Sequence, residues 1–129
     1  MARHRALVVD DNLDAAHALG FLIEDLGFEV SFAATGDEAL RAAALKLPDV
    51  ILLDIGLPNL NGWDVALQIR SSLDLKRTLI IAVTGYGTAA DMLKSDESGI
   101  DHHFTKPATF ADLEPLLVRL KANPPLSSR

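Results

Sequence analysis

Apolar residues gather in five short runs along the chain, and each run is predicted to form a β-strand. The first, third and fourth runs are nearly continuous, as in strands that are buried on both faces of a parallel sheet, whereas the fifth has apolar residues only at its two ends. The second run alternates apolar and polar residues, which is typical of a half-buried strand. The predicted strands cover residues 6–9, 28–33, 50–53, 79–83 and 100–104.

A stretch with helical spacing of apolar residues follows each predicted strand. Thr35 and Glu38 have the spacing of a capping box, and Gly27 is placed to end the first helix. Pro115 falls inside the last helical stretch, where we expect a kink or a lost hydrogen bond. The predicted helices cover residues 15–26, 36–46, 65–69, 89–98 and 110–120, and the fourth has the weakest pattern.

The alternation of strands and helices predicts an α/β fold in which a parallel sheet has helices on both faces. With 129 residues the chain has the length of one compact domain, which we assign to residues 1–122. Residues 123–129 are predicted to form a flexible C-terminal tail.

Charge and composition narrow the possible partners and cofactors. The net charge of -6 argues against a surface that follows the phosphates of nucleic acid. No apolar run is long enough to cross a membrane, so we expect a cytoplasmic protein with no membrane partner. With no cysteine, the chain has neither a disulfide nor a thiolate metal site.

Chemically versatile side chains follow the carboxyl ends of the predicted strands. They are Asp10, Asp11, Asp54, Thr84 and Lys106. In open parallel sheets these strand ends meet at one edge, where ligands bind. Three carboxylates at one edge repel each other by about 4 kcal/mol per pair at ~4 Å and an effective dielectric of about 20, so a cation is expected among them. Oxygen ligands favour Mg²⁺, and Lys106 adds a second positive charge.

Asp54 is the best candidate for a nucleophile. Asp54 is the single acid at the end of the central predicted strand. Asp10 and Asp11, in contrast, form a pair that is suited to binding a metal and its waters. A carboxylate can attack a phosphoryl group if a metal and a lysine balance the charge of the transferring oxygens. Thr84 offers a hydroxyl to a phosphate oxygen.

Each of these residues also has a simpler interpretation when it is taken alone. An aspartate after a strand is often a turn former or a helix cap, and a lone lysine is usually a solvated charge. Their convergence on one sheet edge favours the functional interpretation. By contrast, His102 and His103 are neighbours on a predicted strand, so their side chains point to opposite faces and cannot chelate one metal. Trp63 is expected to pack in the fold or to contact a partner.

The chain resembles response-regulator receiver domains, including single-domain chemotaxis regulators and the receiver modules of hybrid histidine kinases. The resemblance covers nearly the whole chain and implies a doubly wound, flavodoxin-like sheet of order 2-1-3-4-5 flanked by five helices. The segments that carry it are Val8-Val9-Asp10-Asp11-Asn12, Leu52-Leu53-Asp54, Pro58 to Gly62, Val83-Thr84-Gly85 and Lys106-Pro107.

This resemblance implies a role for individual residues. Asp54 is the implied phosphorylation site, and Mg²⁺ is bound by Asp11, Asp54 and the Gly56 carbonyl, with Asp10 reaching it through water. Lys106 is implied to pair with the acceptor and then with the phosphate.

The resemblance also implies a switch. Thr84 moves toward the phosphoryl group, and the bond between Lys106 and Pro107 is cis. Relatives often carry Tyr or Phe as the rotating partner of the threonine, whereas this chain has His103 there.

The implied partners are a histidine kinase or a histidine phosphotransfer protein, with a homodimer through the face of the fourth helix, fifth strand and fifth helix as a further possibility. The implied role is a phosphoacceptor switch and not an enzyme. Three other functions are alternatives to this role: an aspartate-nucleophile phosphatase, a flavin carrier and a receiver domain that has degenerated into a docking surface. The phosphatase needs a second acid at the position of Gly56, and the flavin carrier needs a phosphate-binding loop in place of Asp10 and Asp11.

Overall fold

A computed structural model of the chain describes residues 3–57, 60–85, 87–106 and 108–126. Within these ranges five parallel strands form one sheet in the order β2-β1-β3-β4-β5, as expected. The strands are β1 (Arg5–Val9), β2 (Glu29–Ala33), β3 (Val50–Leu53), β4 (Leu79–Thr84) and β5 (His102–Thr105). β1 and β3 lie side by side although a strand and two helices separate them in sequence.

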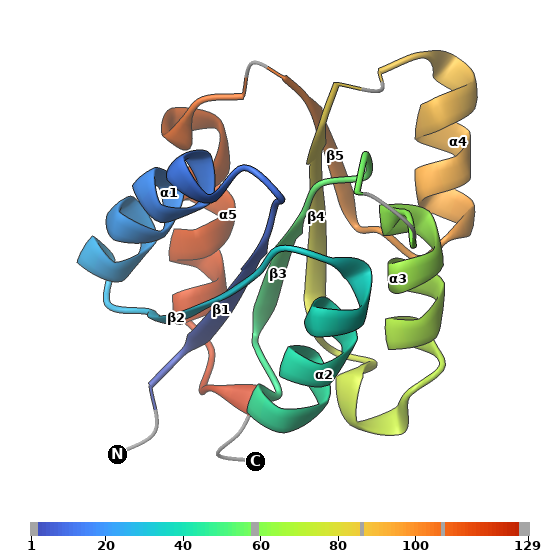
Figure 1. The fold of residues 1–129 in the computed structure, drawn as a ribbon. Coiled ribbons are helices and arrows are strands. Elements are labelled where there is room, and N and C mark those ends of the chain that lie inside the picture. The colour runs from blue at the N-terminus through green and yellow to red at the C-terminus, as the bar shows by residue number, and fades with distance from the viewer. Residues whose placement is uncertain (1–2, 58–59, 86, 107, 127–129) are drawn as a thin grey trace.

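Helices cover both faces of the sheet (Figure 1). α1 and α5 lie on one face, and α2, α3 and α4 lie on the other. Their bounds are α1 (Leu13–Asp25), α2 (Gly36–Lys46), α3 (Gly62–Arg70), α4 (Ala89–Glu97) and α5 (Phe110–Lys121), with a short 3-10 helix at Leu73–Leu75 that the sequence pattern did not predict. None of the helices in the described ranges is long and apolar enough to cross a membrane.

The end of α1 and the start of α2 have the capping residues that the sequence predicted. The Thr35 hydroxyl accepts a hydrogen bond from the Glu38 amide at the start of α2, and Gly27 follows α1 with a φ of 99°. α5 continues through Pro115, so this residue does not end the helix. Proline has no N–H, so the hydrogen bond that residue 115 would otherwise donate to the Ala111 carbonyl is lost.

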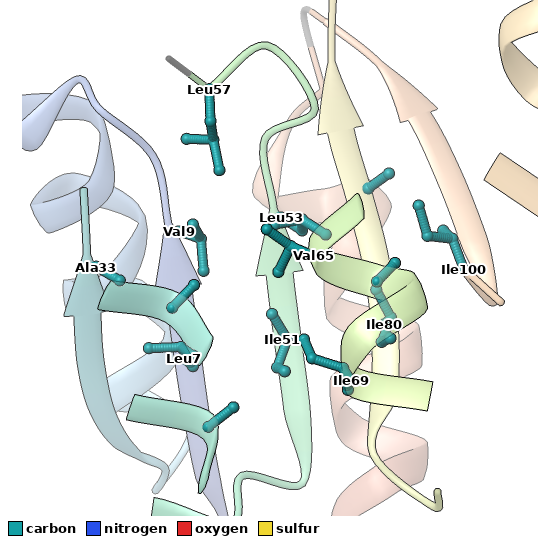
Figure 2. Packing of buried hydrophobic residues seen from close by; sticks show 14 of the residues in the cluster. Leu7, Val9, Ala33, Ile51, Leu53, Leu57, Val65, Ile69, Ile80 and Ile100 are labelled. Carbon is teal, nitrogen blue, oxygen red and sulfur yellow. The ribbon is translucent and has the colours of Figure 1, made fainter. Parts of the chain in front are cut away.

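Two apolar cores lie on the two faces of the sheet. Figure 2 shows part of the core beneath α2 and α3, where Ile51 and Leu53 of β3 approach Val65 and Ile69 of α3. The core on the other face joins the sheet to α1 and α5 through Ile23, Leu113 and Leu117, among others. Because β3 is buried throughout, its carboxyl end is fixed in position, and Asp54 follows directly after it.

Residues 123–126 contact the edge of the sheet opposite the strands' carboxyl ends. The Asn123 carbonyl lies 2.6 Å from Nε2 of His4, and the Leu126 amide donates to Asp49 at 2.7 Å. The first part of the predicted tail is therefore tied to the domain, and residues 127–129 lie outside the described residues.

Candidate functional site

Three aspartates converge at the carboxyl ends of β1 and β3. Val9 and Leu53 are in register on these adjacent strands, so the residues that follow them, Asp10 and Asp54, emerge side by side. One carboxylate oxygen each from Asp10, Asp11 and Asp54 lies within 4.8 Å of the others. The side chains of Asp10 and Asp54 are 15% and 12% exposed, whereas Asp11 is an exposed residue. The cluster thus joins two sheltered acids to one open to solvent.

Backbone amides orient the two sheltered carboxylates. The Gly56 amide donates to Asp54 Oδ1 at 3.0 Å, and the Asn12 amide donates to Asp10 Oδ1 at 2.9 Å. The Asp54 amide donates to the Val9 carbonyl at 3.0 Å, which continues the pairing of β1 with β3. Both side chains are therefore held by the turns that end their strands.

Lys106 brings a positive charge to the acids from the end of β5. Its ammonium lies 3.4 Å from Asp54 Oδ2 and 3.7 Å from Asp10 Oδ2. These distances exceed those of a tight charge-assisted bond, and the lysine side chain is 43% exposed, so the pairs contribute little to folding stability. One lysine against three carboxylates leaves the group with two negative charges in excess at neutral pH.

Thr84 is the last residue of β4, and its side chain is fully buried. It pairs with Thr105, and its carbonyl accepts the Lys106 amide at 2.7 Å. The backbone of Thr84 therefore fixes the start of the segment that carries the lysine. Pro107, predicted to follow a cis bond, lies outside the described residues.

The five predicted site residues thus reach one rim of the sheet from three of its strand ends and from the segment after β5. Beneath Asp10 and Asp54 the structure leaves only a cavity of about 30 Å³. Two larger surface hollows, of about 490 and 460 Å³, lie beside the loop between α4 and β5 and are not lined by the three acids. A reactant must therefore approach the acids from the open rim.

The donor set suits a small, hard divalent cation. It offers carboxylate oxygens and neither sulfur nor imidazole within the described residues of the cluster. Mg²⁺ prefers such ligands and keeps several waters, which the exposure of Asp11 permits. A divalent ion would also cancel the two excess negative charges.

Comparison with known proteins identifies the family of the chain. The family model described as the response regulator receiver domain matches residues 6–117. The chain belongs to this receiver domain family. As the resemblance implied, it is a receiver domain of the two-component type, a family of signalling switches.

Two curated relatives illustrate where such receiver domains occur. Over 120 residues the chain is 38% identical to the sensor histidine kinase AtsR of Burkholderia thailandensis, covering 91% of this chain and 20% of that protein. Over 129 residues it is 34% identical to the probable transcriptional regulator ycf27 of Cyanophora paradoxa, covering 98% of this chain and 53% of that protein. The chain therefore spans about half or less of the length of these relatives.

Solved receiver domains have the same fold. A CheY-like receiver domain protein from Methanospirillum hungatei is 28% identical with a TM-score of 0.85, covering 94% of this chain and 96% of that one. The receiver domain of a sensor histidine kinase from Pseudomonas aeruginosa is 30% identical with a TM-score of 0.83, covering 95% of this chain and 100% of that one. That structure has a magnesium ion coordinated in its active-site cleft.

One group of hydrogen-bonded side chains near the site was not predicted from the sequence. Trp63, which we expected to pack or to contact a partner, donates its indole N–H to Ser95, and Ser95 in turn contacts His103. The sequence feature that could have indicated this group is Ser95, a serine at a position of α4 that faces the core, because a buried hydroxyl needs a hydrogen-bond partner.

Proposed function

We propose that this receiver domain accepts a phosphoryl group on Asp54 from a phosphohistidine donor. The observation that carries the proposal is the position of Asp54, held between a lysine ammonium at 3.4 Å and two further carboxylates suited to a metal. The amide of Gly56 on Oδ1 keeps the carboxylate in one orientation, which favours attack on an incoming phosphorus atom. The fold family supports this role.

In the proposed reaction an oxygen of the Asp54 carboxylate attacks the phosphorus of the donor. The new O–P bond forms as the N–P bond to the donor imidazole breaks, and the imidazole nitrogen recovers a proton from solvent. Lys106 lies where it can offset negative charge on the transferred oxygens. The products are an aspartyl phosphate and a free histidine, so the chain acts as an acceptor and switch whose only chemistry is on itself.

Mg²⁺ would be held by Asp11, Asp54 and the Gly56 carbonyl, with Asp10 acting through a bound water. When bound, the ion neutralises negative charge on the phosphoryl oxygens. The chemistry of the carboxylates supports this assignment, and so does their excess negative charge.

Phosphorylation is proposed to change the surface formed by α4, β5 and α5. Thr84 would turn its hydroxyl to the phosphoryl group, and His103 on the neighbouring strand would move with it. The two residues lie on one face of the sheet, because Thr84 pairs with Thr105, two residues beyond His103. Apolar side chains are exposed on this surface, and they suit a partner or a second copy of the chain; they are Met92, Leu93 and Val118.

The donor is proposed to be a histidine kinase or a histidine phosphotransfer protein in the cytoplasm, with no nucleic acid or membrane contact by this domain. Residues 1–122 would form the receiver, and residues 123–129 a tail whose described part, 123–126, is anchored to the domain.

Intact mass spectrometry after exposure to a small phosphodonor with Mg²⁺ tests the proposal. The wild type should gain one phosphoryl group that is stable in acid and lost in base. Asp54→Asn and an EDTA-treated sample should gain none, while Asp14→Asn, which removes an exposed acid of α1 outside the cluster, should behave as wild type. An unchanged wild-type mass would favour a docking module that has lost phosphotransfer.

A further inference from the structure

Three side chains form a chain of hydrogen bonds that joins α3, α4 and β5. Trp63 Nε1 lies 2.9 Å from Ser95 Oγ, and Ser95 Oγ lies 2.7 Å from His103 Nδ1. Ser95 is 1% exposed, so its hydroxyl has no access to water. Lys94, the preceding residue, places its ammonium 4.5 Å from the centroid of the Trp63 ring. Two consecutive residues of α4 therefore hold the tryptophan.

The hydrogen bonds of this chain have one direction. An indole N–H can only donate, so Ser95 Oγ accepts from Trp63. The serine hydroxyl must then donate its own proton, and the only acceptor in contact with it among the described residues is Nδ1 of His103. Nδ1 is thus an acceptor, and the ring proton of His103 is on Nε2.

One end of this hydrogen-bonded series lies beside the backbone of the proposed phosphorylation site, and the other lies on the strand that leads to Lys106. Trp63 follows Gly62, where a Cβ atom would lie 2.7 Å from Ile55 Cα and 2.9 Å from the Asp54 carbonyl. The start of α3 therefore packs directly against the Asp54 turn. At the other end, His103 precedes Lys106 by three residues on the strand that pairs with the end of β4.

We propose that Ser95 is a positioning residue that holds the imidazole of His103 against α4 in the unphosphorylated receiver, and that this hydrogen bond breaks when the receiver switches. The inference rests on the proposed function and adds to it a residue that sets the equilibrium between the unphosphorylated and the phosphorylated arrangement of the receiver. A contact made in only one of two states favours that state, and its loss favours the other by the same factor. Removal of the Ser95 hydroxyl therefore shifts the receiver toward its phosphorylated arrangement.

Beryllium fluoride with Mg²⁺, an analogue of the phosphoryl group, measures this shift at equilibrium. Ser95→Ala should bind it about twofold to tenfold tighter than wild type, the range for one hydrogen bond. Ser95→Thr keeps the hydroxyl and should restore wild-type affinity. His103→Phe removes the acceptor from the other end and should also tighten binding, and the double variant should add nothing further. A serine that only helps α4 to pack would give no such non-additivity.

The side-chain nitrogen resonances of ¹⁵N-histidine-labelled protein provide a second readout. In the free wild type, His103 should show an unprotonated Nδ1, and beryllium fluoride should change that signal. Trp63→Phe keeps the ring but removes the donor, so Ser95 gains a free lone pair and both ring tautomers should appear. Circular dichroism and thermal melting identify any variant that fails to fold. If Ser95→Ala does not fold, His103→Phe still tests the proposal.

The outcomes separate this inference from the proposed function. If the wild type is phosphorylated but Ser95→Ala and His103→Phe bind the analogue like wild type or more weakly, the positioning role is wrong and Asp54 stays the acceptor. If the wild type neither gains a phosphoryl group nor binds the analogue, both proposals fail.

Discussion

Lys106 and Asp54 are 52 residues apart in sequence, yet the lysine ammonium lies 3.4 Å from Oδ2 of the aspartate. Four parallel strands, β1, β3, β4 and β5, produce this proximity, because each delivers its carboxyl end to the same rim. The lysine is also close to Asp10, so it faces two sheltered carboxylates at once. Its position suggests a role in chemistry more than in folding.

Lys106→Ala should therefore separate phosphorylation from stability. Its side chain is 43% exposed and its two ion pairs are long, so the free energy of unfolding should change by less than about 1 kcal/mol. Phosphorylation by a small phosphodonor should slow at least about tenfold, because a charge facing the transferring oxygens is lost. Intact mass spectrometry measures the phosphorylation rate, and urea denaturation measures the free energy of unfolding.

Lys106→Arg is the matched control, since it keeps the charge on a longer and planar group. Its rate should fall between those of wild type and Lys106→Ala. A wild-type rate for Lys106→Ala would show that the ammonium does not act on the phosphoryl group.

Magnesium should stabilise the fold through the three acids. A ligand that binds only the folded state raises the melting temperature as its concentration increases, and here it also relieves carboxylate repulsion. In EDTA, Asp11→Asn should have a higher melting temperature than the wild type. Its affinity for Mg²⁺ should be lower than that of the wild type by a factor of about ten or more. Melting curves over a series of Mg²⁺ concentrations, with Asp14→Asn as the control, check both effects. Equal responses of Asp11→Asn and wild type would exclude Asp11 as a ligand.

The fold and the rim could be predicted from the sequence because both depend on local signals. Apolar runs mark β1, β3 and β4, and the residue just after a buried strand necessarily reaches its end. The order of the strands came from family resemblance, since apolar patterning does not say which strands pair. Strand β5 begins at His102, two residues later than predicted, because Ile100 is an apolar residue of the preceding loop packed into the core.

Contacts between polar side chains distant in sequence could not be predicted in this way. Arg70 at the end of α3 donates to the carbonyls of Thr78 and Gly99 and pairs with Asp101 at 2.6 Å. These partners depend on the geometry of two loops, one before β4 and one between α4 and β5, and no periodicity in the sequence predicts that geometry. The bond between Ser95 and His103 is of the same kind.

Asp49 is a second buried polar residue whose role only the structure reveals. Its side chain accepts the Arg5 amide at 2.7 Å and the Leu126 amide at 2.7 Å, and the residue is 1% exposed. Asp49→Ala leaves both amides without this acceptor and should cost about 2–4 kcal/mol of unfolding free energy. Asp49→Asn keeps one acceptor oxygen and should lose about half as much. Urea denaturation gives both values, and a loss below about 1 kcal/mol for Asp49→Ala would mean that the segment at Leu126 is not held by this residue.

Gly62 should be intolerant of even one added carbon. A Cβ there would lie 2.7 Å from Ile55 Cα and 2.9 Å from the Asp54 carbonyl, and backbone atoms cannot move aside as a flexible side chain can. Gly62→Ala must therefore push α3 away from the turn that carries Asp54, which should lower both the melting temperature and the phosphorylation rate. Gly85→Ala is the control for stability, because a Cβ at Gly85 meets nothing within 4 Å. If Gly62→Ala melts like Gly85→Ala, the close packing of α3 on the Asp54 turn is wrong, and with it the route by which Trp63 is connected to the phosphorylation site.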